Sequence, residues 1–179
     1  GDKYFKENDD RPFNGIVFDM SKKTGNKILE YKMVDGLKNG LYQEWSSDGT
    51  LIKKGKYVNE IQNGKWTYWY ENEQKKKEGT YNNGKLNGLW TYWDKNDGKV
   101  YKGKFINFKD KNIDRSLLNG SYFGYEQGGL FHGNLKDGRE DGLLTMWDEN
   151  GNKMYEGNWK DGKRDGLVTE WYENGQKKK

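Results

Sequence analysis

The stretch that decides the fold is residues 155–166, which read YEGNWKDGKRDG. It ends on an Asp-Gly pair, and pairs of this type, Asn-Gly or Asp-Gly, recur along the chain. The glycines of the five most regular pairs are Gly40, Gly64, Gly88, Gly142 and Gly166. Three of the four steps between them are 24 residues long. Repetition at a fixed period is the signature of an array of equal structural units, so the sequence predicts a repeat protein.

The repeats share further positions. Five residues after each of these glycines stands a tryptophan, namely Trp45, Trp69, Trp93, Trp147 and Trp171. Asn-Gly and Asp-Gly tolerate the positive φ angles of tight hairpin turns, and 24 residues hold two strands of about six residues with two turns. A helix is disfavoured because each glycine in its interior costs about 1 kcal/mol. We therefore predict an all-β fold of tandem antiparallel β-hairpin repeats, about 24 residues each, that form one elongated twisted sheet.

Alternation along a strand assigns side chains to the two faces of the sheet. In the strand after Gly64, Trp69 points to one face and Trp66 to the other. Both faces then carry an apolar row, which neighbouring hairpins can bury although a lone hairpin cannot. The tryptophan row is therefore expected to be structural, and a second glycine of each repeat, such as Gly55, to let an aromatic ring lie flat on the backbone. Between hairpins we expect a seven-residue turn, as over residues 82–88.

The composition fits an ordered chain with a thin aromatic core. Glycine accounts for 25 of 179 residues, beside one proline, eight tryptophans and thirteen tyrosines. Tryptophan and tyrosine can supply the apolar area that aliphatic residues do not. The net charge of +4 permits an anionic partner without requiring one. Without cysteine the chain has no disulfide, no thiolate chemistry and no cysteine-based metal site.

Three stretches, residues 79–88, 133–142 and 155–166, share one pattern: a glycine, an aromatic residue or leucine two positions later, and two further glycines in turns. This pattern resembles the MORN repeat (membrane occupation and recognition nexus). The added segment at residues 171–175 resembles the bacterial MORN variant of antitoxin- or immunity-like proteins. The resemblance covers about residues 14–175. It implies a β-hairpin array that contacts protein or lipid and has no enzymatic activity.

Few residues suggest catalysis. His132 is the sole histidine, and no motif frames it as a base, so it is expected to be a structural residue in a second strand. The carboxylates mostly occupy turns, where they support turn geometry. The hairpin period explains the glycines, so no phosphate-binding loop is expected. We therefore predict a protein that is not an enzyme and has no cofactor and no metal site.

One segment breaks the repeat, because residues 106–120 take fifteen positions where a regular connection has seven. We expect residues 1–13 to be a lead-in and residues 14–179 to be the array, with this irregular insert. Regular repeats present a uniform surface, so residues that select one partner are expected where the repeat is interrupted. Long connections between strands are often functional. The candidate partner contacts are Lys109, Lys111, Ile113, Arg115, Leu117 and Leu118. The alternative is a surface excursion whose leucines tuck back onto the sheet.

The sequence therefore predicts a non-catalytic scaffold for protein–protein interaction that is antitoxin- or immunity-like. The alternative is a cell-envelope module for glycan or lipid headgroups, which would need exposed aromatic rows. A protein partner is expected, glycan and anionic lipid stay open, and nucleic acid is not expected. No transmembrane segment is expected, because no apolar run approaches roughly 18 residues. Bacterial cytoplasm and cell envelope both fit, and the oligomeric state and a removed signal peptide stay open.

Overall fold

The structure is a computed structural model that describes residues 10–126 and 129–178. In this part of the chain it contains fourteen β-strands, one short 3₁₀ helix and no α-helix. The chain divides into two compact units, unit 1 (Gly1–Asn87) and unit 2 (Gly88–Lys179), and each is described by itself. The predicted fold class, an all-β array of antiparallel hairpins, is confirmed.

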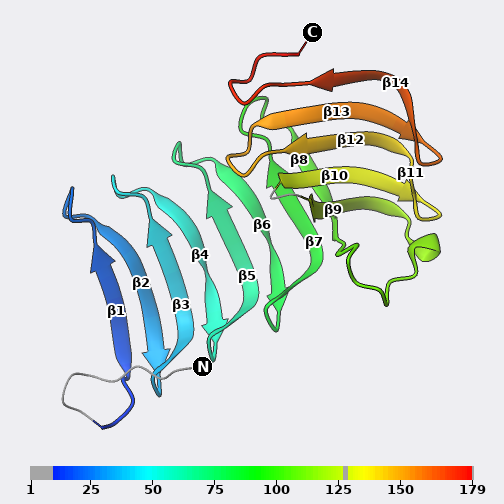
Figure 1. Ribbon diagram of the computed structural model, residues 1–179. Coiled ribbons are helices and arrows are strands. Elements are labelled where there is room, and N and C mark those ends of the chain that lie inside the picture. The colour runs from blue at the N-terminus through cyan, green and yellow to red at the C-terminus, as the bar shows by residue number, and fades with distance from the viewer. Residues whose placement is uncertain (1–9, 127–128, 179) are drawn as a thin grey trace. The chain divides into compact units, whose positions relative to one another are not determined.

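Unit 1 is a row of neighbouring strands in chain order (Figure 1, blue to green). Its strands are β1 (Gly15–Met20), β2 (Lys27–Val34), β3 (Leu37–Trp45), β4 (Leu51–Val58), β5 (Ile61–Trp69) and β6 (Lys75–Asn82). Each of these strands pairs antiparallel with the next, so every connection between them closes a hairpin. Strand β7 (Lys85–Trp93) begins in unit 1 and continues into unit 2.

Unit 2 continues the strand pattern but contains one parallel pairing. Its further elements are β8 (Val100–Phe105), η1 (Arg115–Leu117), β9 (Gly120–Glu126), β10 (Gly129–Lys136), β11 (Arg139–Glu140), β12 (Gly142–Trp147), β13 (Lys153–Lys160) and β14 (Lys163–Glu170). Strand β8 pairs antiparallel with β7 and parallel with β9. From β9 onward the strands are antiparallel neighbours in the order β9, β10, β12, β13 and β14, with β11 paired to β10 (Figure 1).

Five turns are two residues long, which corrects one expectation: those between β2 and β3, β4 and β5, β6 and β7, β10 and β11, and β13 and β14. Both turn residues have positive φ, for example 48° at Asn59 and 67° at Glu60, as a type I′ turn requires. The seven-residue turn expected over residues 82–88 is wrong. A two-residue turn at Asn83 and Gly84 is followed directly by β7.

The glycines that define the period lie within strands, at β-bulges. Each is the fourth residue after a two-residue turn, and each has positive φ; they are Gly40, Gly64, Gly88, Gly142 and Gly166. Between the partner pairs Lys56–Asn63 and Lys54–Thr67, strand β5 has two residues more than β4. A bulge with positive φ selects glycine for the same reason as a tight turn does, so the two features share one sequence signal.

Adjacent hairpins are linked at their turns by backbone hydrogen bonds. In unit 1 the N–H of Gly84 donates to the carbonyl of Gln62 at 2.9 Å. In unit 2 the N–H of Gly162 donates to the carbonyl of Glu140 at the same distance. Each accepting residue stands two positions before a repeat glycine, so the bond recurs with the period and holds neighbouring hairpins in register.

The core of unit 1 centres on Trp66 of β5, which is 0% exposed. Its indole lies on the backbone of Gly55 in β4, where a Cβ atom would stand 2.1 Å from the ring. The rings of Tyr57 and Tyr42 pack against it with centroid distances of 5.2 and 5.7 Å. The expectation that a repeated glycine lets a ring lie on the backbone is therefore confirmed at Gly55.

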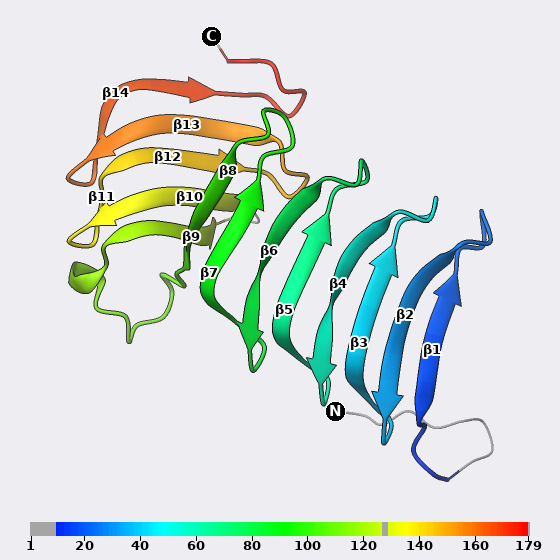
Figure 2. The same ribbon diagram turned by 180° about the vertical axis from the view of Figure 1, so that it is seen from behind.

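Unit 2 has apolar packing on both faces of its sheet. One face carries a buried cluster made of Tyr122, Phe131 and Leu135. On the other face the β7–β8 hairpin crosses the sheet (Figure 2), and Tyr92 and Tyr101 pack against Trp147 with centroid distances of 4.7 and 4.8 Å. Unit 2 is thus locally two layers thick.

Candidate functional site

The irregular insert, residues 106–120, is a folded cover on one face of unit 2. Ile106 and Phe108 are half-buried and pack against the cluster around Tyr122. The insert then forms η1, whose N-cap Asp114 accepts a hydrogen bond of 3.0 Å from a backbone N–H of its first turn. The insert therefore contributes to the core as well as to the surface.

Contacts to the next hairpin turn fix η1 in place. The guanidinium of Arg115 lies 4.6 Å from the centroid of the Phe108 ring and forms an ion pair of 3.5 Å with Glu140. The N–H of Gly138 donates to the carbonyl of Leu118 at 2.9 Å. A Cβ atom at Gly138 would stand 2.0 Å from the carbonyl oxygen of Arg115, so glycine is needed for this close approach.

The six contact residues predicted from the sequence fall into two groups. Leu118 is half-buried and packs against the Tyr122 cluster, so this leucine does tuck back onto the sheet, and Ile113 is also half-buried. The exposed members are Lys109, Lys111, Arg115 and Leu117. Leu117 is 75% exposed, although it belongs to a well-anchored helical turn. The surface of the insert therefore combines one protruding apolar side chain with three cations.

The predicted tryptophan row is buried to different degrees. Trp147 is 1% exposed. The half-buried members are Trp45, Trp69, Trp93 and Trp171. The ammonium of Lys27 lies 5.9 Å from the ring centroid of Trp45, and that of Lys153 lies 5.7 Å from Trp171. The described rings of this row are therefore buried at Trp147 and half-buried elsewhere.

The face of unit 1 that carries Trp66 alternates aromatic rings with lysines. The ammonium of Lys53 lies 5.1 Å from the ring centroid of Tyr42, and that of Lys77 lies 4.6 Å from Tyr68. Burial lowers the pKa of Lys77. Lysine stems cover apolar rings while cation–π contacts satisfy the ammonium groups, so this face is packed within itself.

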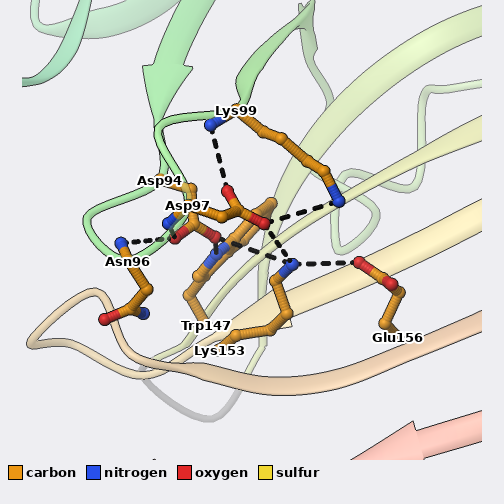
Figure 3. A network of polar contacts seen from close by, with 7 residues as sticks. All are labelled: Asp94, Asn96, Asp97, Lys99, Trp147, Lys153 and Glu156. Atoms are coloured by element: carbon orange, nitrogen blue, oxygen red, sulfur yellow. Dashed lines mark hydrogen bonds and ion pairs between the residues drawn. The ribbon is translucent and has the colours of Figure 1, made fainter.

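A buried charge network in unit 2 was missed by the sequence analysis (Figure 3). Asp94, just after β7, is 2% exposed and accepts a hydrogen bond of 2.5 Å from the indole N–H of Trp147. The ammonium of Lys153 lies 3.9 Å from Asp94, 3.2 Å from Asp97 and 3.0 Å from Glu156. The network ties the β7–β8 loop to β12 and β13.

Electrostatics keep two members of this network charged. Burial alone would lower the pKa of Lys153, but hydrogen bonds to Glu156 and Asp97, together with Tyr101 nearby, raise it above its ordinary value. Burial alone would likewise raise the pKa of Asp97, but the backbone N–H of Lys99 and the ammonium of Lys153 lower it. Lys153 and Asp97 therefore stay ionised at neutral pH, and they stabilise the loop as an ion pair and do not act as a proton donor or acceptor.

His132 of β10 is packed between two rings. Its ring centroid lies 5.1 Å from that of Tyr101 and 4.8 Å from that of Phe123. Its Nε2 atom lies 3.2 Å from the carbonyl oxygen of Lys102, which can only accept a hydrogen bond. Burial lowers the pKa of His132, although this hydrogen bond acts in the opposite direction. The geometry is that of a structural histidine.

Two further observations bear on ligands. Among the described residues, no group of three or more His, Cys, Asp or Glu side chains is arranged to hold a metal ion. In the same part of the chain, no helix has the length and apolar character needed to cross a membrane.

Comparison with known families assigns the repeats. Four segments match the model described as the MORN repeat variant: residues 38–59, 62–83, 140–161 and 164–179. Two of them lie in unit 1 and two in unit 2. Among curated proteins, none matches the chain. Because each matched segment begins two residues before a repeat glycine, the period of the family model and the hairpin period coincide, and these four segments are similar to the MORN repeat variant.

Proposed function

We propose that the chain is a non-catalytic scaffold that binds another protein through the insert of unit 2. The observation that carries this proposal is Leu117, which is 75% exposed on a backbone that is anchored on both sides. An apolar side chain on a pre-ordered support loses little conformational entropy when it binds. The exposed Lys109 and Lys111 can orient an approaching partner.

The aromatic residues favour this class over a glycan-binding module. Stacking on sugars needs ring faces that are open to solvent. Trp66 is 0% exposed and Trp147 is 1% exposed, and both are packed against other rings. The repeats thus use their rings to stabilise the array, which leaves the insert as the better binding element.

Photo-crosslinking tests the proposal directly. A photo-reactive amino acid replaces Leu117 in the full chain, in cells that naturally express it, and a matched variant carries it at Leu89, which is 67% exposed in β7. We expect a discrete protein adduct from position 117 that is absent from position 89 and is lost when Lys109 and Lys111 are changed to Gln. No adduct at position 117, or the same adducts from both positions, would contradict the proposal.

A finer proposal is that the bound protein is a toxin and the scaffold acts as its antitoxin or immunity protein. It rests on the resemblance of residues 171–175 to the bacterial MORN variant. Co-expression with the products of neighbouring genes tests it, because the scaffold should restore growth and Leu117→Asp should abolish the rescue. If no neighbouring product is toxic, or if rescue survives Leu117→Asp, this finer proposal is wrong.

A further inference from the structure

The residues that flank the two-residue turns are apolar in two hairpins of unit 1 and cationic in two hairpins of unit 2. In each hairpin these two residues are direct cross-strand partners. The flanking pairs of two hairpins in unit 1 are apolar: Val34–Leu37 and Val58–Ile61. The equivalent pairs of unit 2 are cationic: Lys136–Arg139 and Lys160–Lys163. We refer to these four residues of unit 2 as the cationic row.

The cationic row places like charges opposite each other, and the described residues form no ion pair with it. Like charges directly opposite each other destabilise an antiparallel pair, whereas apolar partners stabilise it. All four side chains are exposed. Within residues 10–126 and 129–178, none of the four has an ion pair or a side-chain hydrogen bond. Repetition of an unfavourable pair in two successive hairpins points to a ligand that neutralises it.

The two cationic pairs are next to each other in space. The N–H of Gly162 in the second turn donates to the carbonyl of Glu140 beside Arg139. A Cβ atom at Gly162 would stand 3.8 Å from the Cβ atom of Arg139. Because the row crosses four neighbouring strands about 4.8 Å apart, it extends over about 14 Å. The row is therefore one continuous feature at the turn end of unit 2.

Two exposed leucines lie on the same face as the row. Leu143 is 38% exposed and pairs with Asn158, which is two residues before Lys160 and so shares its face. Leu167 of β14 is 91% exposed and precedes Val168, which faces the other way with Gly157. A ligand that covers the cationic row can therefore also bury apolar side chains.

We propose that the cationic row, together with Leu143 and Leu167, binds an acidic, leucine-containing extended segment of a partner protein. This inference rests on the proposed protein-binding function and names the chemistry of the partner. The turn residues Asp137 and Asp161 stand between the two cations of each pair. A membrane or a nucleic acid would bring a uniform layer of negative charge against these carboxylates, whereas a peptide can place its acids on the cations alone.

The spacing of the row selects the form of the peptide. Lys136 and Lys160 are the first cations of the two pairs. They lie two strands apart, which corresponds to a distance of about 9.6 Å. A polyproline II segment advances about 9.3 Å in three residues and returns to the same face. An acidic residue at every third position therefore matches the row, and leucines between the acids can reach Leu143 and Leu167.

Peptide binding by the full chain tests the inference. The probe is a fluorescein-labelled peptide of three Pro-Glu-Leu repeats, and its control has the same composition with the glutamates adjacent. The test variant changes the four cations of the row to Gln. A matched control variant changes four exposed cations of unit 1 to Gln, and so alters the net charge equally: Lys22, Lys23, Lys54 and Lys56. Affinity is measured by fluorescence anisotropy at low and at physiological salt.

We expect the regular peptide to bind more tightly than the control peptide, and the test variant to lose about tenfold or more in affinity. The unit 1 control variant should keep its affinity, and the melting temperature of the test variant should stay equal or rise because repulsion is removed. Equal loss in both variants, no binding of the peptide, or binding only of anionic vesicles or single-stranded DNA would overturn the inference. None of these results bears on crosslinking at Leu117, so the proposed function is judged separately.

Discussion

The contact between Gly55 and Trp66 offers a sharp test of how the repeats are packed. Gly55→Ala adds one methyl group at a point where the indole lies 2.1 Å from the ideal Cβ position. No real Cβ atom tolerates such a distance, so either the backbone of β4 or the ring must move. Because Trp66 is 0% exposed and enclosed by tyrosines, the ring has no free space to enter.

The expected magnitudes follow from the packing. Overpacking of a closed core costs about 1–3 kcal/mol, so Gly55→Ala should lower the free energy of unfolding by this amount. Removal of a large buried aromatic side chain costs about 3–5 kcal/mol, which is the expectation for Trp66→Ala. In the double variant the added methyl group fills part of the space left by the indole. Gly55→Ala should then cost nothing or even stabilise the protein.

The assay is equilibrium urea unfolding of the wild type, both single variants and the double variant, followed by far-ultraviolet circular dichroism. A coupling energy of at least about 1 kcal/mol between the two sites is expected. The reasoning is refuted if the costs of the two substitutions add within about 0.5 kcal/mol, because the ring would then not lie on Gly55.

Two further predictions concern the buried network of unit 2. Asp94→Ala removes the hydrogen-bond acceptor of the buried indole N–H of Trp147, whereas Lys153 keeps its ion pairs with Asp97 and Glu156. The free energy of unfolding should therefore fall by about 1–3 kcal/mol, whereas the exposed Asp165→Ala should change it little; equal urea midpoints for the two variants would contradict this. The second concerns pH: because the pKa of Asp97 is lowered in the folded state, its contribution to stability is present above its unfolded pKa of about 3.9 and is lost as pH falls through the folded value. The stability difference between wild type and Asp97→Asn should therefore shrink on acidification below about pH 4, and a difference that is constant from pH 7 to pH 3 would rule this out.

The fold class could be predicted because one physical requirement repeats along the chain. Glycine recurs every 24 residues where the backbone needs positive φ, and that period defines the hairpins. The local geometry could not be read in the same way, because a tight turn and a bulge impose the same requirement. Gly84 closes a turn and Gly88 forms a bulge, yet both follow an asparagine in the sequence.

The candidate sites were harder to predict, because they depend on contacts between distant residues. Asp94 and Trp147 are 53 residues apart, and their hydrogen bond arises from the crossing of the β7–β8 hairpin over the sheet of unit 2. The one signal in the sequence was a departure from the repeat, since Asp94 stands where the preceding copy has Tyr70. The insert was recognisable by its length. The difference in burial between Leu117 and Leu118 was not, because it depends on the packing of Leu118 against the Tyr122 cluster.

The insert also explains why the period is interrupted between Gly88 and Gly142. In unit 1 the first strand begins after Asn14, whose side-chain oxygen accepts a hydrogen bond of 2.9 Å from the backbone N–H of Asp35 in the turn between β2 and β3. In unit 2 Asn119 accepts an equivalent bond of 2.9 Å from Asp137. Strand β9 thus begins a stack of hairpins in the same way as β1 does.

At both starts the bond that a preceding hairpin would supply comes from the connection itself, because the carbonyls of Phe13 and Leu118 accept hydrogen bonds of 2.9 Å from the N–H groups of Gly36 and Gly138. A stack can therefore start anew after any connection that delivers such a carbonyl, followed by Asn-Gly, to the sheet. The copy at residues 120–142, which looks degenerate in the sequence, is on this argument the first unit of a second stack. The insert is then free to diverge in length and composition, because regularity is needed only from Asn119 onward. This is the physical reason why residues 106–118 can carry the proposed binding element without loss of the hairpins on either side.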